Sequence, residues 1–250
     1  LSVTVSDDKG APVTLDTLDE WMADPRIGLA APSATTTAAG KYSSTTKTVT
    51  VYGATPAYAP INGQTVLLGR FLTQADVENH TSVCIITEKT AEDMVGYADC
   101  LGEEISLDGR KFTVVGILKN DDESLTGILT KNSMIAYIPY TTLMRLSATV
   151  SSTITSFSVS APEGGNMAAT ESAMKRLLLD RFEALNREGR ATILMVTHDA
   201  FTASYASRIL FLQDGKIFTE LNKGSDSRSA FFEKILHVLT LLGGGESHVC

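Results

Sequence analysis

Apolar residues recur at strand and helix spacing through the first 165 residues, with turn-forming residues between the runs. Thr14 is a favourable N-cap, and apolar residues follow it at positions 15, 18 and 22 until Asp24-Pro25 ends the helical pattern. Apolar runs predict strands at 27–31, 48–52, 82–87, 104–107, 111–118, 134–138 and 153–160. Helical patterns lie at 89–95 and 141–146. This mixture predicts an α+β fold up to about residue 178.

Local signals indicate where helices begin and chains turn in this region. Thr73 and Asp76 have the spacing of a capping box, which predicts a short helix after Thr73. Asp108-Gly109 favours a type I′ hairpin turn, because both positions of that turn need positive φ. The stretch 33–46 is rich in Ser, Thr, Ala and Gly and predicts an exposed loop or an irregular hairpin. The apolar residues 58–61 fit either a partner contact or a packed connection.

A long helix is predicted after Asn166, which can serve as its N-cap. Its apolar positions are Met174, Leu177, Leu178, Phe182 and Leu185. Gly189 supplies a stop, and an apolar strand follows at 191–196. A hairpin is predicted around Asp214-Gly215, and Ser227 can cap a final apolar helix.

The charge balance changes along the chain. The 250 residues carry a net charge of −8. Residues 1–180 account for all of it, because they contain 13 Lys and Arg residues and 21 Asp and Glu residues. Residues 181–250 carry 8 of each sign. Such a change indicates two parts of different origin. The acidic composition also argues against binding of nucleic acid, which requires a basic surface.

Few residues carry the chemistry of an active or metal site. Cys84, Cys100 and Cys250 lack zinc-site spacing, and the first two fit either a disulfide or two free thiols. His80 is interpreted as a surface residue. Asp121-Asp122-Glu123 fits a solvated loop or a calcium site, although it lacks the spaced ligands and the glycine of such sites. No metal site is predicted. With no run of about 20 apolar residues and a start at Leu1, the chain is expected to be an excised soluble piece.

Three stretches occur in a recognisable order in the first part of the chain. They are Leu67-Leu-Gly-Arg-Phe-Leu-Thr73, Leu101-Gly-Glu-Glu-Ile105 and Phe112-Thr-Val-Val-Gly-Ile-Leu118, followed by Ile138-Pro139 and the strand at 153–160. In order and spacing, residues 1–178 resemble the extracytoplasmic domain of MacB/FtsX-type ABC permeases. The resemblance implies a non-catalytic, two-lobed α+β domain with a mixed sheet, on the outer face of a bacterial cell membrane. Its implied partners are an ABC ATPase subunit, the membrane region of the permease, and an export partner or a peptide or lipid substrate.

The tail carries a different set of motifs. Ala191-Thr-Ile-Leu-Met-Val-Thr-His198-Asp199 is followed by a short helical stretch, then Arg208-Ile-Leu-Phe-Leu-Gln-Asp-Gly-Lys-Ile217 and a last apolar helix from Phe231. These resemble the C-terminal end of the ATPase of bacitracin-exporter and MacB-type ABC transporters, a cytoplasmic protein. The resemblance gives His198 the place of the switch histidine, which hydrogen-bonds the γ-phosphate in a complete ATPase.

His198 is the one cofactor-binding candidate, and its role requires a complete nucleotide site. A P-loop reads G-x-x-x-x-G-K-[ST]. Gly40-Lys41 and Gly215-Lys216 do not match it, because Tyr42 and Ile217 follow them. Leu177-Leu-Leu-Asp180 imitates a Walker B strand, but its helical spacing and Arg181 argue against that role. We therefore expect no catalytic residue and no cofactor, with ATP and magnesium bound only in the complete parent transporter.

The two parts predict domains at 1–178 and 179–250, joined inside one helical pattern near 178–182. Because their relatives lie on opposite sides of a membrane, this join indicates a chimeric chain, a gene-assembly error or a merged chain. Three functions stay open: a binding and force-transmitting domain of a permease, an ATP-binding fragment that a partner completes, and an interaction module unrelated to transport.

Overall fold

The computed structural model of the chain describes residues 1–4, 13–120, 133–147, 150, 152–188 and 192–243. The chain divides into unit 1, Leu1–Ala173, and unit 2, Met174–Cys250. The acidic cluster at 121–123, Gly189 and Cys250 fall outside the described residues.

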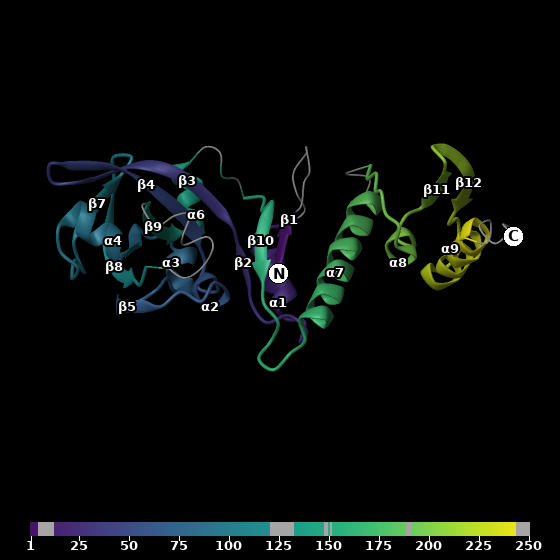
Figure 1. Cartoon of the computed structure of the whole chain (residues 1–250), viewed down its shortest axis with the longest axis horizontal. Coiled ribbons are helices and arrows are strands. Elements are labelled where there is room, and N and C mark those ends of the chain that lie inside the picture. The colour runs from purple at the N-terminus through teal and green to yellow at the C-terminus, as the bar shows by residue number, and fades with distance from the viewer. Residues whose placement is uncertain (5–12, 121–132, 148–149, 151, 189–191, 244–250) are drawn as a thin grey trace, which may run out of the picture. The chain divides into compact units, whose positions relative to one another are not determined.

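The small lobe of unit 1 combines a three-stranded antiparallel sheet with one helix. Strands β1 (Ser2–Thr4), β10 (Ser156–Val159) and β2 (Ala30–Pro32) pair in that order (Figure 1). Helix α1 (Leu15–Met22) starts as predicted, because Thr14 accepts a hydrogen bond from the backbone N–H of Thr17. The ring of Trp21 on α1 lies 5.9 Å from that of Phe157 on β10, so aromatic packing joins the helix to the sheet.

The large lobe of unit 1 is built on a seven-stranded mixed sheet. Its strands, in spatial order, are β5 (Val66–Gly69), β8 (Arg110–Leu118), β6 (Val83–Thr87), β9 (Met134–Pro139), β4 (Thr45–Ala54), β3 (Ala34–Tyr42) and β7 (Glu104–Leu107). The β6–β8 and β4–β9 pairs are parallel. Strand β7 pairs with β8 as well as β3, so the sheet returns upon itself. This closure encloses a core that includes Phe112, Ile105 and Ile138.

Short helices fill the connections of the large lobe. They are α2 (Tyr58–Ile61), α3 (Gln74–Glu78), α4 (Glu88–Thr90), the π-helical turn η1 (Ala91–Val95) and α6 (Tyr140–Leu146). The hydroxyl of Thr90 accepts from the backbone N–H of Ile135 at 2.8 Å and ties α4 to β9. The ring of Tyr58 lies 5.4 Å from that of Tyr137, which favours a packed connection for residues 58–61.

Several local predictions for the large lobe are confirmed. The capping box forms between Thr73 and Asp76 at the start of α3. Asp108 and Gly109 have φ values of 48° and 83°, as a type I′ turn requires. Cys84 and Cys100 are buried free thiols. His80 is less exposed than expected: it is half-buried, and its Nδ1 has no hydrogen-bond partner among the described residues.

The prediction of a loop or irregular hairpin at 33–46 is wrong. Strand β3 occupies Ala34–Tyr42 and pairs with β4 in unbroken antiparallel register, forming a long regular hairpin (Figure 1). The inward positions of β3 include Ala38 and Gly40, which are too small to give a visible apolar alternation. Its outward positions include Thr35 and Thr37, and threonine favours strands because it is β-branched.

Unit 2 has a small core of its own. The long helix α7 (Met167–Arg187) contains the border between the units, and unit 2 continues with α8 (Ala200–Ala203), the hairpin β11 (Arg208–Gln213) and β12 (Lys216–Asn222), and α9 (Arg228–Gly243). Asn166 caps α7 through the N–H of Ala168 at 2.8 Å. Ser227 caps α9 through the N–H of Ala230 at 3.2 Å. Phe231 and Ile235 of α9 pack with Phe211 of β11.

The predicted strand at 191–196 is absent from its described part, residues 192–196. Leu194 and Val196 are 93% and 95% exposed there. The apolar composition of this segment is typical of a strand buried between neighbours in a parallel sheet. Unit 2 has only one described sheet, the β11–β12 hairpin, and the segment does not pair with it. Apolar composition alone is therefore not enough to make the strand.

Candidate functional site

A cavity of about 200 Å³ lies where the small and large lobes of unit 1 meet. Its walls come from α1, β2 and the residues before it, the connection after β4, and α3. Most of the lining is aliphatic, including Leu15, Leu18 and Met22 of α1. The polar lining residues are Asp19, Thr55 and Gln74, which belong to three different segments. An apolar cleft with a few convergent polar groups is the usual form of a small-molecule site.

The rim of this cavity is negatively charged. Helices α1 and α3 read Leu-Asp-Thr-Leu-Asp-Glu-Trp-Met and Gln-Ala-Asp-Val-Glu, so neither contains a lysine or an arginine. Partial burial raises the pKa of Asp19, and the nearby carboxylates of Asp16 and Glu78 raise it further. A cation beside Asp19 would offset the repulsion among these three carboxylates.

Thr55 adds an unsatisfied polar group to the lining. Its Oγ1 is shielded from solvent and has no hydrogen-bond partner among the described residues. A buried hydroxyl without a partner is unfavourable by about 1–3 kcal/mol, and such groups in native proteins call for an explanation. Because this oxygen is shielded, Thr55 lines the cavity through its other atoms.

An ion pair between the exposed Arg70 and the buried carboxylate of Asp76 fixes helix α3, which forms one wall of the cavity. Arg70 donates to both carboxylate oxygens of Asp76, at 2.6 and 3.2 Å. The backbone N–H and hydroxyl of Thr73 donate to the same carboxylate at 2.8 and 2.6 Å, and Thr81 donates at 3.1 Å. Burial alone raises the pKa of Asp76, but these hydrogen bonds outweigh it and hold that pKa well below its usual range. Asp76 is therefore a positioning residue for the wall.

Two glycines allow Arg70 to reach this position. Gly69 has a φ of 71°, and a side chain there would collide with the carbonyl oxygen of Val115. A side chain at Gly116 would collide with the carbonyl oxygen of Arg70. Because both obstacles are backbone atoms, close approach of β5 to β8 requires glycine at these positions.

The chain passes between the lobes twice, and the two crossings meet. The first is Ser33, the single residue between β2 and β3. The second runs from α6 of the large lobe to β10 of the small lobe. The backbone N–H of Ser33 donates to the carbonyl of Ser156, at the start of β10, at 2.8 Å. This bond joins the first crossing to the start of β10, where the second crossing ends.

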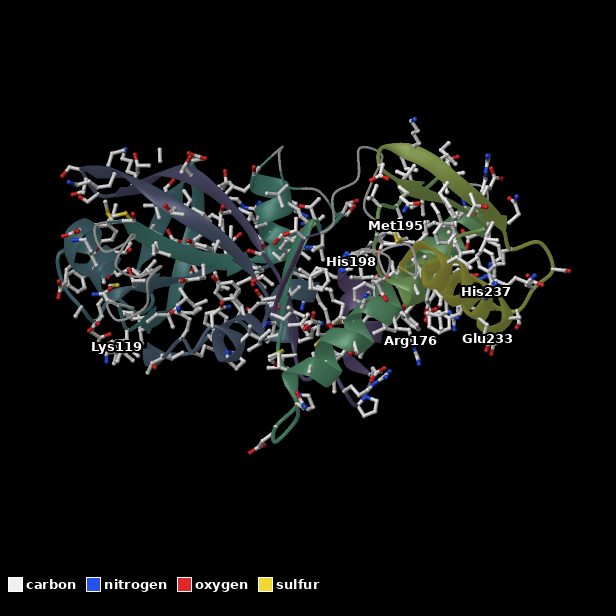
Figure 2. The ribbon with its side chains drawn as sticks, turned by 45° about the vertical axis from the view of Figure 1, so that its right-hand side comes forward. Lys119, Arg176, Met195, His198, Glu233 and His237 are labelled. Atoms are coloured by element: carbon white, nitrogen blue, oxygen red, sulfur yellow. The ribbon has the colours of Figure 1, made fainter. Side chains whose placement is uncertain are left out.

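His198 of unit 2, the candidate switch histidine, is exposed. Figure 2 labels His198 and Met195 on the connection between α7 and α8. The described residues offer His198 no hydrogen bond. The next residue, Asp199, caps α8, and hydrogen bonds from Lys175 and Thr202 hold its pKa below the usual range. An exposed imidazole can donate to a phosphate oxygen, but the structure brings no further sequence-predicted site residue to it.

The cavity was only partly predictable from the sequence. The helical spacing of positions 15, 18 and 22 predicted an apolar face on α1, and that face lines it. Nothing in the local pattern singled out Asp19, Thr55 or Gln74, because their convergence depends on tertiary contacts between distant segments. Across the described ranges, no three His, Cys, Asp or Glu residues group as metal ligands would. None of the helices in those ranges combines the length and the hydropathy that crossing a bilayer requires.

Comparison with known structures shows the fold of unit 1. The periplasmic region of MacB from Actinobacillus actinomycetemcomitans superposes with a TM-score of 0.59 at 17% identity, covering 77% of this chain and 92% of that one. The extracellular domain of the ABC-type transporter YknZ from Gram-positive bacteria gives 0.57 at 19% identity, covering 72% and 92%. At these identities the likeness concerns the fold alone.

Two kinds of curated relative match the sequence. The bacitracin export ATP-binding protein BceA of Halalkalibacterium halodurans is 51% identical over 67 residues, 27% of this chain and 26% of that protein. The macrolide export ATP-binding/permease protein MacB of Neisseria gonorrhoeae is 26% identical over 140 residues, 56% of this chain and 21% of that protein. The chain thus spans about a quarter of the length of these relatives. Both resemblances read from the sequence are confirmed.

The family model of the MacB-like periplasmic core domain matches residues 1–177, well over half of the chain. Domains of this family are non-catalytic parts of ABC transporter permeases. The likeness of fold to the MacB and YknZ domains agrees with this match. The chain therefore belongs to the family of MacB-like periplasmic core domains, as the extracytoplasmic part of an ABC transporter permease.

Proposed function

We propose that unit 1 engages a substrate or an export partner and transmits motion between the membrane region of its permease and the outer face. In this role it carries out no reaction and binds no nucleotide. The partners are an ABC ATPase subunit, the membrane region of the permease, and an exported molecule or outer partner. The family match and the ATP-binding relatives support transporter partners.

One observation carries the mechanical part of this proposal. The Ser33–Ser156 hydrogen bond joins the two chain segments that connect the lobes. A force applied to one lobe passes to the other through both crossings, and this bond makes them move together. The cavity lies at the same lobe junction, so a molecule bound there would be coupled to the relative position of the two lobes.

We expect Ser33→Pro to uncouple the lobes and Ser33→Ala to leave them coupled. Proline has no N–H, so it removes the bond to Ser156, whereas alanine keeps it. The measurement is the distance between spin labels at Glu20 and Lys47, in the complete transporter with Cys250 replaced by serine. Both label positions are exposed, one in each lobe. Cys84 and Cys100 are buried and should escape labelling.

ATP with vanadate should shift the distance distribution in the parent protein and in Ser33→Ala. In Ser33→Pro the distribution should broaden and lose its response to ATP. The proposal is wrong if the lobes keep one distance throughout the cycle, or if the proline variant responds as the alanine variant does.

A second function rests on unit 2. The 51% identity to an ATP-binding protein over 67 residues favours a fragment that a partner completes as a nucleotide site. In that case His198 would hydrogen-bond the γ-phosphate, and ATP with magnesium would be bound only in the completed assembly. The exposed side chains of Leu194 and Val196 are consistent with a segment whose neighbours are supplied by another chain. Unit 2 would then belong on the cytoplasmic side.

A further inference from the structure

The lobe-junction cavity has a polar composition that suits one kind of ligand group. Asp19 and Gln74 are exposed and each offers a side-chain oxygen that accepts hydrogen bonds; Thr55 lines the same cavity, but its Oγ1 is shielded from solvent. A primary ammonium has three N–H donors and no acceptor. It has the charge to pair with Asp19 and donors to spare for a second acceptor such as Gln74, whereas a neutral hydroxyl lacks the charge and a quaternary ammonium lacks the donors.

Charge favours a cation at the same place. The two helices beside the cavity carry Asp16, Asp19, Glu20 and Glu78 without a single basic residue. The nearest basic side chain in sequence to α3 is Arg70, and it is already held by Asp76 in a bidentate pair. The rim thus has excess negative charge that no side chain of α1 or α3 balances.

The size and walls of the cavity define the rest of the ligand. Leu15, Leu18 and Met22 make one wall aliphatic. A volume of about 200 Å³ is smaller than the roughly 300–1,000 Å³ of sites that enclose drug-sized molecules. It suits a short unbranched aliphatic chain.

We propose that this cavity binds a primary ammonium at the end of a short aliphatic chain, with Asp19 pairing with its charge and Gln74 accepting a further hydrogen bond. This inference names the ligand class for the engagement role and in that sense rests on the proposed function. A free alkylamine and a lysine side chain of a peptide share this chemistry.

The test is a titration of the full chain followed by methyl NMR signals of Leu15, Leu18 and Met22. The probes are hexylammonium, hexyltrimethylammonium, 1-hexanol and hexanoate. Hexylammonium should bind roughly tenfold or more tightly than each of the other three, because only it combines the charge with three donors. Nα-acetyl-lysine methylamide distinguishes the sources: tighter binding than hexylammonium indicates a peptide, and weaker binding indicates a free amine.

Variants assign the contacts. Asp19→Asn should weaken hexylammonium binding roughly tenfold. Glu92→Gln is the matched control, because Glu92 is exposed, lies outside the two acidic helices and does not line the cavity. The melting temperature of each variant shows whether it folds, and Gln74→Leu provides an independent variant at the rim.

Equal binding of 1-hexanol, or unchanged affinity in Asp19→Asn, would overturn the proposal. So would shifts confined to the exposed apolar residues of unit 2, such as Leu212 and Ile217. The spin-label experiment and this titration test different proposals. Amine binding without movement of the lobes would contradict only the proposed coupling role, and movement of the lobes without amine binding would contradict only the proposed ligand class.

Discussion

Replacement of Phe112 by alanine is expected to lower the free energy of unfolding of unit 1 by about 3–5 kcal/mol. Phe112 is fully buried on β8, inside the core enclosed by the returning sheet. The loss combines the transfer energy of the ring with the cavity that it leaves, because a closed sheet can collapse only partly around it. Every residue of that core belongs to unit 1, so we expect the loss to be confined to unit 1.

Peptide-level hydrogen exchange with urea titration measures this loss. Protection of β6 and β8 should fall in Phe112→Ala while that of α9 stays unchanged. The reverse is expected for Phe231→Ala, because Phe231 is fully buried in the small core of unit 2. Phe218→Ala is the control for unit 2: this side chain is 50% exposed, and its loss should change stability by about 0.5 kcal/mol or less. Equal loss of protection in both units from either core variant would contradict two separate cores.

The second large effect is expected at Asp76. Asp76→Asn should destabilise unit 1 by about 3 kcal/mol, because the amide N–H₂ group would face donors from Arg70 and Thr73 that now meet a carboxylate. Asp93→Asn is a suitable control, since Asp93 forms an exposed i,i+4 pair with Lys89 and should contribute about 0.5 kcal/mol or less. Urea unfolding at neutral pH measures both variants.

The pH dependence of stability separates a charge effect from a packing effect at Asp76. Its pKa is depressed in the folded state, so its contribution is complete above the unfolded pKa of about 3.9 and is lost as pH falls below that value. The parent protein should therefore lose more stability than Asp76→Asn between about pH 5 and pH 2. Parallel curves for the two proteins would show that Asp76 acts through packing alone.

The local elements of unit 1 were largely predictable because their signals are local. Thr14 and Thr73 cap helices through bonds to residues three positions away, and Asp108-Gly109 makes its turn with its own dihedral angles. Strand β3 was not predictable from apolar alternation, because its inward residues are small. Residues 192–196 show the opposite case: their apolar pattern predicts a strand, but no described neighbouring strand pairs with them and no strand forms.

The candidate site was less predictable than the fold. The apolar face of α1 was visible in the sequence, but the polar lining comes from three segments that only the tertiary structure brings together. The sequence indicated the Thr73–Asp76 capping box but not the ion pair of Asp76 with Arg70, although the three residues lie within seven consecutive positions. For His198 the sequence indicated a role without the rest of a site, and the described structure leaves that residue exposed.

A titration of the purified chain with ATP and magnesium tests most directly whether it is a permease domain that works without nucleotide. Calorimetry and a phosphate-release assay should be run together on the parent chain and on His198→Ala. We expect no saturable binding at millimolar nucleotide and no turnover, with the two proteins indistinguishable. Saturable binding that is lost in His198→Ala, or unaided hydrolysis of ATP, would contradict this.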